Sequence, residues 1–214
     1  MTPKEQSQSA RNLCNIAPVI PVIVIRDAAR AEGLATALVA GGTPVLEVTL
    51  RTDAALDAIR AMAKVAGGHV GAGTVLTPDD ARRAKDAGAT FAVSPGLTER
   101  LARACEEIGL PLLPGCATAT EVMTALDMGY DMLKFFPAEA VGGAPALKSL
   151  AGPLPQASFC PTGGVSPQNA RDYLSLPNVV CVGGSWIATD GDVAAENWSA
   201  IEGRARTAAT LRGN

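Results

Sequence analysis

Short apolar runs alternate along the chain with longer stretches in which alanine and leucine are mixed with charged residues. Each mixed stretch ends near a glycine that precedes the next apolar run, and Gly67, Gly88, Gly109 and Gly129 recur every 20 or 21 residues. This order is typical of repeated β-α units, in which a helix ends at a glycine before the next strand begins. The pattern therefore predicts an α/β fold with a parallel sheet.

Eight of the apolar runs have the length and composition of strands that are buried on both faces. In chain order they are Ala17–Ile25, Val45–Leu50, Val70–Val75, Phe91–Ser94, Leu112–Gly115, Met132–Phe136, Ser158–Cys160 and Val179–Val182. Eight parallel strands close a (β/α)8 TIM barrel. The competing fold, an open doubly wound sheet, usually has a G-x-G-x-x-G turn after its first strand, whereas Ile25-Arg26-Asp27 follows here. We therefore expect a barrel.

Helices are expected to begin where a side chain can cap the first turn or where a proline can occupy it. Such starts are Asp27, Thr52-Asp53, Thr77-Pro78, Thr98-Glu99, Thr118 and Ser166-Pro167. A further helix is expected over roughly Pro3–Asn15, where it could cover the barrel floor. The segment Val141–Pro155 holds three glycines and three prolines, so we expect a short helix there at most. Residues 1–214 are predicted to form one barrel domain, with residues 1–16 as an N-terminal helical extension.

Composition and charge exclude several classes of partner. The 18 basic and 21 acidic residues give a net charge of −3, which provides no positive field for a nucleic acid. The longest apolar run, Ala17–Ile25, is too short to span a membrane, and the N-terminal MTPKEQSQSARNLC lacks the apolar core of a signal peptide. The five cysteines are odd in number and show no C-x-x-C spacing, so we expect reduced thiols in a cytoplasmic protein.

Lysine is scarce, and its placement is informative. Four of the five lysines fall on polar or irregular segments, whereas Lys134 lies inside the apolar run Met132-Leu133-Lys134-Phe135-Phe136. Apolar surroundings favour a neutral amine over an ammonium, and a neutral amine attacks a ketone to form a Schiff base. The alternative is a structural lysine that pairs with a carboxylate or extends its amine to the rim.

The second predicted strand brings further polar groups to the same end of the barrel. In Val45–Leu50 and the following Arg51, positions 47, 49 and 51 share one face because strand side chains alternate. Glu47 could transfer the protons that Schiff-base chemistry requires, and the guanidinium of Arg51 suits a substrate carboxylate. An internal Glu47–Arg51 ion pair without a catalytic role is the alternative.

Paired glycines near the last two strands indicate a phosphate site. Pro161-Thr162-Gly163-Gly164 follows the seventh run, and Gly183-Gly184-Ser185 follows the eighth. Glycines let backbone N–H groups approach an anion, and barrels often bind phosphate at these loops. The third strand adds the small residues of Gly71-Ala72-Gly73 and the hydroxyl of Thr74. The single histidine, His69, falls at the opposite end, so no histidine-bound catalytic zinc is expected.

Six motifs together resemble the class I aldolases that act on 2-keto-3-deoxy-6-phosphogluconate (KDPG) and 4-hydroxy-2-oxoglutarate. These are Leu46-Glu47-Val48-Thr49-Leu50-Arg51-Thr52, Gly71-Ala72-Gly73-Thr74-Val75, Ser94-Pro95-Gly96, Lys134-Phe135-Phe136-Pro137-Ala138-Glu139, Pro161-Thr162-Gly163-Gly164 and Gly183-Gly184-Ser185. The resemblance implies a homotrimeric TIM barrel of the Entner–Doudoroff pathway. It would reversibly cleave KDPG to pyruvate and D-glyceraldehyde 3-phosphate without a metal or other cofactor.

The resemblance also implies a role for each matching residue. Lys134 would form the Schiff base, Glu47 would be the general acid and base, and Arg51 and Thr74 would hold the pyruvate carboxylate. Pro95 and Phe136 would shape the pocket, Thr162 would meet the hydroxylated part of the substrate, and Gly163, Gly164, Gly184 and Ser185 would bind the phosphate. A threonine at position 162 favours the gluconate epimer over the galactonate epimer. The alternatives are an aldolase for 2-keto-3-deoxy-6-phosphogalactonate, a phosphosugar isomerase, and a non-catalytic barrel that binds phosphorylated metabolites.

Overall fold

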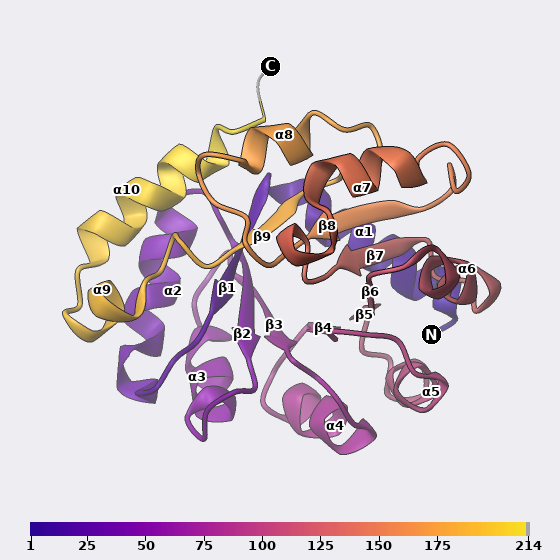
Figure 1. The fold of residues 1–214 in the computed structure, drawn as a ribbon. Coiled ribbons are helices and arrows are strands. Elements are labelled where there is room, and N and C mark those ends of the chain that lie inside the picture. The colour runs from indigo at the N-terminus through magenta and orange to yellow at the C-terminus, as the bar shows by residue number, and fades with distance from the viewer. Residues whose placement is uncertain (213–214) are drawn as a thin grey trace.

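A computed structural model describes residues 1–212, which form a barrel of parallel strands surrounded by helices (Figure 1). The strands are β1 (Val19–Ile23), β2 (Val45–Thr49), β3 (His69–Gly73), β4 (Phe91–Val93), β5 (Leu112–Leu113), β6 (Gly115–Cys116), β7 (Met132–Phe135), β8 (Ser158–Pro161) and β9 (Val182–Gly184). The helices are α1 (Pro3–Ile16), α2 (Ala31–Ala40), α3 (Ala55–Met62), α4 (Pro78–Asp86), α5 (Glu99–Ile108), α6 (Ala119–Asp127), α7 (Gly143–Leu150), α8 (Ala170–Leu174), α9 (Asp190–Ala194) and α10 (Trp198–Ala209), with short 3-10 turns η1 (Ala28–Arg30) and η2 (Glu139–Val141).

The strands are hydrogen-bonded in chain order around the ring, as a TIM barrel requires. Six strands form one run, β5-β4-β3-β2-β1-β9, and three form another, β6-β7-β8. The two runs meet at the fifth predicted strand, which is divided into β5 and β6 at Pro114, a residue that has no N–H to donate to a ladder. On the other side, isolated bridges join Phe159 to Val179 and Thr162 to Gly183, which brings β8 to β9. The predicted barrel is confirmed.

Several predicted boundaries differ from the observed ones. The last strand was expected over Val179–Val182 but is Val182–Gly184, because Gly183 and Gly184 pair with Ile20 and Pro21 of β1 instead of forming a loop. Thr77, Thr98 and Thr118 cap their helices as expected. The hydroxyl of Thr52 instead donates to Ile25 O, and α3 begins at Ala55. Helix α8 begins at Ala170, after the expected Ser166-Pro167 start.

Two apolar cores are separated by the wall of strands. The larger core lies between strands and outer helices, and α10 packs along α2 on the outside (Figure 1). The smaller core fills the barrel interior, to which α1 contributes Ala10 and Cys14 from below. Strand members of this interior core are Ile20, Val45, Phe91, Val93, Leu113, Met132 and Cys160. The lower half of the barrel is therefore filled, and polar interior side chains lie above it.

Helix α1 covers the floor, as its sequence predicts. Gln6 accepts a hydrogen bond from Leu112 N at 3.0 Å, and Ser7 Oγ accepts from Asp131 N and Met132 N at 2.9 and 3.2 Å. Arg11 donates to Ser158 Oγ at 2.8 Å. The bonds to Gln6 and Ser7 satisfy backbone N–H groups where β5 and β7 begin, and the Arg11 bond joins α1 to a side chain at the start of β8. The exposed His69 also lies at this end, at the start of β3.

Candidate active site

Lys134 and Glu47 meet inside the upper half of the barrel, although they come from strands on opposite sides of the ring. Lys134 lies on β7 and Glu47 on β2. Lys134 Nζ is 3.1 Å from Glu47 Oε1, and the two side chains are only 7% and 4% exposed. The alternative considered from the sequence, an internal Glu47–Arg51 ion pair, is not formed, because the carboxylate pairs with Lys134 instead. An amine and a carboxylate are thus in direct contact at the centre of the barrel, within reach of proton transfer.

The glycine at the end of β3 leaves room for this pair. A Cβ built on Gly73 would overlap Glu47 Oε1 and would lie 2.9 Å from the Glu47 carboxyl carbon. The expectation that small residues of β3 open the barrel centre is confirmed at this position. At Gly71 the space is filled instead by the ring of Phe91, which belongs to the interior core. Gly73 therefore lies at the boundary between the apolar lower half of the barrel interior and the polar site above it.

Arg51 and Thr74 lie together at the top of β2 and β3. Arg51 Nε donates to Thr74 Oγ1 at 3.4 Å, and the Arg51 side chain is exposed. Thr74 has φ of +59°, a left-handed conformation that costs a β-branched residue about 1–3 kcal/mol. Within residues 1–212 no carboxylate forms an ion pair with Arg51, so its guanidinium is available to an anion. The hydroxyl of Thr49 is not available, because it donates to Ile23 O on β1 at 2.9 Å.

Phe136 connects the lysine to the glycine-rich turn after β8. Lys134 Nζ lies 5.2 Å from the centroid of the Phe136 ring. A Cβ on Gly163 would lie 3.3 Å from the same ring, so the turn passes directly beside it. Thr162 is buried and pairs with Gly183 of β9, where a Cβ would overlap the Thr162 hydroxyl oxygen. The predicted residues of β7, β8 and β9 are therefore brought together.

The two glycine pairs, Gly163-Gly164 and Gly183-Gly184, have different backbone structures. Gly163 and Gly164 have φ of +98° and +80°, so this turn requires glycine at both positions. The N–H of Gly164 has no acceptor within the described part of the chain, and the residue is exposed. Gly184 is buried as the last residue of β9, and the exposed Ser185 follows it. A backbone N–H and a serine hydroxyl are thus presented at neighbouring strand ends, which is an arrangement suited to a phosphate.

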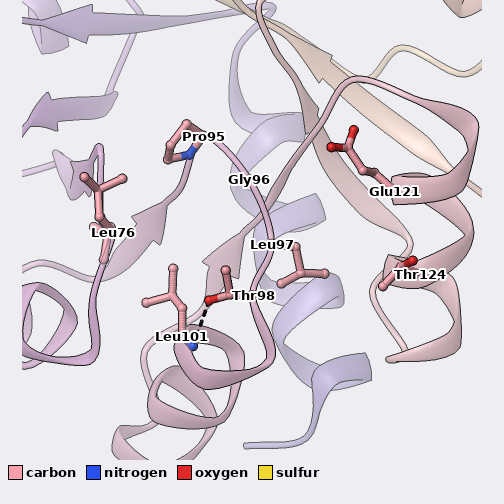
Figure 2. Close-up of a pocket in the computed structure, with 9 residues that line it drawn as sticks. Leu76, Pro95, Gly96, Leu97, Thr98, Leu101, Glu121 and Thr124 are labelled. Carbon is pink, nitrogen blue, oxygen red and sulfur yellow. Dashed lines mark hydrogen bonds between the residues drawn. The ribbon is translucent and has the colours of Figure 1, made fainter.

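Pro95 lies at the edge of a separate apolar pocket of about 320 Å³ above β3 and β4. Figure 2 shows Pro95 beside Leu76, with Leu97 and Leu101 on the wall formed by α5 and its preceding loop. The Ser94 hydroxyl donates to Gly96 O at 2.6 Å and holds this turn. Neither Lys134 nor Glu47 lines this pocket. The backbone of Pro95 nevertheless passes directly beside Gly115, the residue that pairs with Lys134, so Pro95 lies between the pocket and the polar centre.

The cysteines are free thiols inside the protein. All five are buried, and burial raises the pKa of both Cys105 and Cys116 to about 12, whereas hydrogen bonds with Cys14 and Cys181 hold the pKa of Cys160 well below its usual value. Across residues 1–212 no group of three His, Cys, Asp or Glu side chains is arranged to hold a metal ion. In the same range, no helix has the length and apolar character needed to cross a membrane. Lys134 and Glu47 are the oppositely charged side chains that the fold buries in contact at this site.

Comparison with known proteins assigns the family. The family model described as KDPG and KHG aldolase matches residues 10–203, which include every site residue above. The chain belongs to the KDPG and KHG aldolase family. The KHG/KDPG aldolase of Escherichia coli strain K12 is 51% identical over 206 residues, which cover 96% of this chain and 97% of that protein.

Solved structures of this aldolase family share the fold of the chain. The 2-keto-3-deoxy-6-phosphogluconate aldolase of Zymomonas mobilis ZM4, solved with 3-phosphoglycerate, has a TM-score of 0.91 and 48% identity, with 96% and 97% of the two chains covered. The KDPG aldolase of Legionella pneumophila, solved with pyruvate captured as a covalent carbinolamine intermediate, has a TM-score of 0.90 and 46% identity, with 93% and 97% covered.

Two residues beside the aldolase site were not assigned a role from the sequence. Glu139 is the last residue of the motif that begins at Lys134, but that motif does not show what the Glu139 carboxylate contacts. Tyr173 was not singled out at all, because it lies on a short helix after the glycine turn and reaches the site only through the fold. The structure joins them, since the Tyr173 hydroxyl donates to Glu139 Oε1.

Proposed function

We propose that this chain is a class I aldolase that reversibly cleaves KDPG to pyruvate and D-glyceraldehyde 3-phosphate through a Schiff base on Lys134. The observation that carries the proposal is the buried contact between Lys134 Nζ and Glu47 Oε1 at 3.1 Å. A buried lysine beside one carboxylate can become a neutral nucleophile when its proton moves to that carboxylate. The same carboxylate then holds the proton that the next step needs.

Imine formation follows from this proton transfer. The neutral Lys134 amine attacks the C2 carbonyl of the keto acid to give a carbinolamine. Glu47 in its acid form protonates the carbinolamine hydroxyl, which leaves as water, and the nitrogen lone pair forms the C=N⁺ bond. Glu47 is again a carboxylate and faces a cationic iminium, so the charge balance of the site is unchanged.

Cleavage uses the iminium as an electron sink. Removal of the proton from the C4 hydroxyl, with Glu47 as the base, lets the C3–C4 bond break, and its electron pair moves to C3 and on to the iminium nitrogen. The products of this step are D-glyceraldehyde 3-phosphate and a neutral enamine. Protonation of the enamine at C3 and addition of water to the resulting iminium release pyruvate and restore the Lys134 amine.

The other residues are assigned to substrate binding. Arg51 and Thr74 bind the carboxylate of the keto acid, and Phe136 and Pro95 shape the pocket around the pyruvate part. Thr162 meets the hydroxylated carbons, and Gly163, Gly164, Gly184 and Ser185 bind the phosphate. The contacts from Lys134 through Phe136 to Gly163 support this order along the substrate. Phosphate binding far from the breaking bond serves to position the substrate.

The relatives support both the chemistry and the substrate. The Legionella enzyme forms a covalent carbinolamine with pyruvate, which is the first intermediate proposed here. The Zymomonas enzyme was solved with 3-phosphoglycerate, a phosphorylated three-carbon acid. The name of the Escherichia coli relative includes KHG, so we infer a second activity, the cleavage of 4-hydroxy-2-oxoglutarate to pyruvate and glyoxylate. For the phosphorylated substrate, Thr162 favours the gluconate epimer over the galactonate epimer.

The remaining properties proposed for this aldolase rest on the family and on the thiols. We infer a homotrimer in which each chain is one barrel domain, with no metal or other cofactor, because the iminium itself accepts the electrons. Five free cysteines support a cytoplasmic location, where thiols stay reduced. The substrate is a small phosphorylated keto acid, and neither a nucleic acid nor a membrane is a partner.

Borohydride trapping with pyruvate tests the proposal. Reduction of the imine adds the pyruvate-derived group to the peptide that contains Lys134, as measured by mass spectrometry. Lys134→Met should abolish the added mass, and Lys148→Met, on helix α7, should leave it unchanged. A phosphosugar isomerase on the same barrel would give no added mass. A non-catalytic barrel would bind KDPG without releasing pyruvate, and Lys134→Met would retain that binding.

A further inference from the structure

Glu139 lies beside the glycine turn, yet the aldolase mechanism gives it no task. Its backbone N–H donates to Gly163 O at 3.0 Å, and Ala138 N donates to Thr162 O at 2.8 Å. The segment after β7 therefore continues the strand ladder alongside the segment after β8. This pairing fixes where the Glu139 side chain begins relative to the turn.

The Glu139 side chain packs directly against Gly164. A Cβ built on Gly164 would lie 2.5 Å from Glu139 Cγ and 2.6 Å from Glu139 Cβ. The stem of Glu139 thus occupies the space above Gly164 where another residue would carry its own side chain. A different orientation of the Glu139 side chain would therefore remove the packing contact that the Gly163–Gly164 turn makes with it.

Tyr173 determines the direction of that stem. Its hydroxyl donates to Glu139 Oε1, and the tyrosine is only 1% exposed on α8. Burial and the adjacent carboxylate raise the pKa of Tyr173, so the hydroxyl keeps its proton and acts as a donor. Gly143 packs against this hydrogen bond, because a Cβ built there would lie 3.4 Å from both Glu139 Oε1 and the Tyr173 hydroxyl oxygen.

A second set of contacts holds the glycine turn. Asn169 Nδ2 donates to Gly164 O at 3.2 Å, and Ser166 N donates to Asn169 Oδ1 at 2.7 Å. The turn is therefore held by two separate contacts, packing against the Glu139 stem and a hydrogen bond from Asn169. With two left-handed glycines, it has many other conformations available unless such contacts select one.

We propose that Glu139 and Tyr173 are positioning residues for phosphate recognition. The hydrogen bond from Tyr173 holds the Glu139 stem against Gly164, and this contact keeps the Gly163–Gly164 turn in the conformation that presents the Gly164 N–H to the phosphate. The inference rests on the proposed aldolase function and deepens it. It predicts that loss of the bond weakens the binding of phosphorylated substrates and spares the chemistry at Lys134.

The test compares a phosphorylated with a phosphate-free substrate. In Tyr173→Phe we expect the KM for KDPG to rise about 5–10-fold, as for one lost hydrogen bond, with kcat changed less than about twofold. The pyruvate concentration that gives half-maximal borohydride trapping should stay within about twofold. Glu139→Ala should raise the KM for KDPG at least as much as Tyr173→Phe, because it also removes the stem. Glu139→Gln keeps the stem and an acceptor oxygen, so its KM for KDPG should stay near the wild-type value.

The chain provides a matched control in its second tyrosine. Tyr130 is also buried, and its hydroxyl donates to a glutamate, Glu106, at 3.4 Å, but it lies before β7 at the floor of the barrel. Tyr130→Phe should leave the KM for KDPG unchanged. Equal losses with KDPG and pyruvate in Tyr173→Phe would show a merely structural role, and no loss with either would show that the bond does not position the turn. A wild-type protein that forms no adduct with pyruvate would instead overturn the aldolase assignment.

Discussion

The two ends of the barrel use polar groups in opposite ways. At the floor, Gln6, Ser7 and Arg11 of α1 each bond a partner near a strand start, and the apolar Ala10 and Cys14 fill the space above them. At the top, a lysine and a glutamate are buried together, Thr74 is in a left-handed conformation, and the Gly164 N–H has no acceptor among residues 1–212. The floor ties α1 to the strand starts, although the buried Gln6 Nε2 has no partner among the described residues. The top keeps a strained residue and an exposed N–H that a substrate can use.

This difference gives the two ends different energetic roles. A buried ion pair gains Coulomb energy but loses the hydration of both charges, so it is weak evidence for stability. A buried serine that satisfies two backbone N–H groups removes two desolvation costs without adding a charge. Substitutions at the top should therefore affect turnover most, and substitutions at the floor should affect unfolding alone.

The largest effect is expected at Glu47. Glu47→Gln preserves the shape of the side chain beside Gly73 but removes the carboxylate to which we assign the proton transfers. We expect kcat for KDPG cleavage to fall about 10²–10⁴-fold, the usual contribution of a general acid or base, with KM changed far less. Steady-state pyruvate release measures both.

A carboxylate on the outer surface is the control for the loss of charge. Glu99 on α5 is exposed and pairs with Arg103. Glu99→Gln should therefore leave kcat unchanged. If the Glu47→Gln variant retained the wild-type kcat, Glu47 would be excluded from the proton transfers. The top of the barrel would then have no assigned base.

Much of the fold follows from local sequence patterns. The apolar runs are strands because parallel strands covered on both faces need continuous apolar residues, and Thr77, Thr98 and Thr118 cap helices because their oxygens bond the first turn. The last strand was misplaced because Gly183 and Gly184 have the local character of a turn. Only the pairing with β1 and the Thr162 hydroxyl beside Gly183 make them strand residues.

The site residues that could be predicted from the sequence are charged residues inside otherwise apolar strands. Lys134 and Glu47 stand out on their own strands, but their mutual contact depends on the closure of the ring, which no local pattern describes. The role of Gly73 in making room for Glu47 and the bond from Tyr173 to Glu139 also depend on distant segments. Composition and spacing identify reactive groups, and the tertiary fold determines their partners.

The second effect concerns the stability of the buried pair. Lys134→Met leaves Glu47 buried without its partner, which should lower the free energy of unfolding by about 3–5 kcal/mol. Lys134→Met/Glu47→Leu removes both charges and should be at least as stable as the wild type, although it cannot form the imine. Urea denaturation of the three proteins measures this. A double variant less stable than the wild type would mean that the pair stabilises the barrel, and the contrast between the two ends would fail.

The smallest effect is expected at the floor, at Ser7. Ser7→Ala leaves the N–H groups of Asp131 and Met132 without their buried acceptor, which should lower the free energy of unfolding by about 2 kcal/mol. Turnover of KDPG should stay within twofold, because Ser7 lies below the interior core and the reacting groups lie above it. Ser149→Ala on α7 is the control, since that hydroxyl is exposed and donates only to Pro145 O of its own helix. A fall in turnover without a fall in stability would show that the floor also acts on the chemistry, through the start of the β7 strand that carries Lys134.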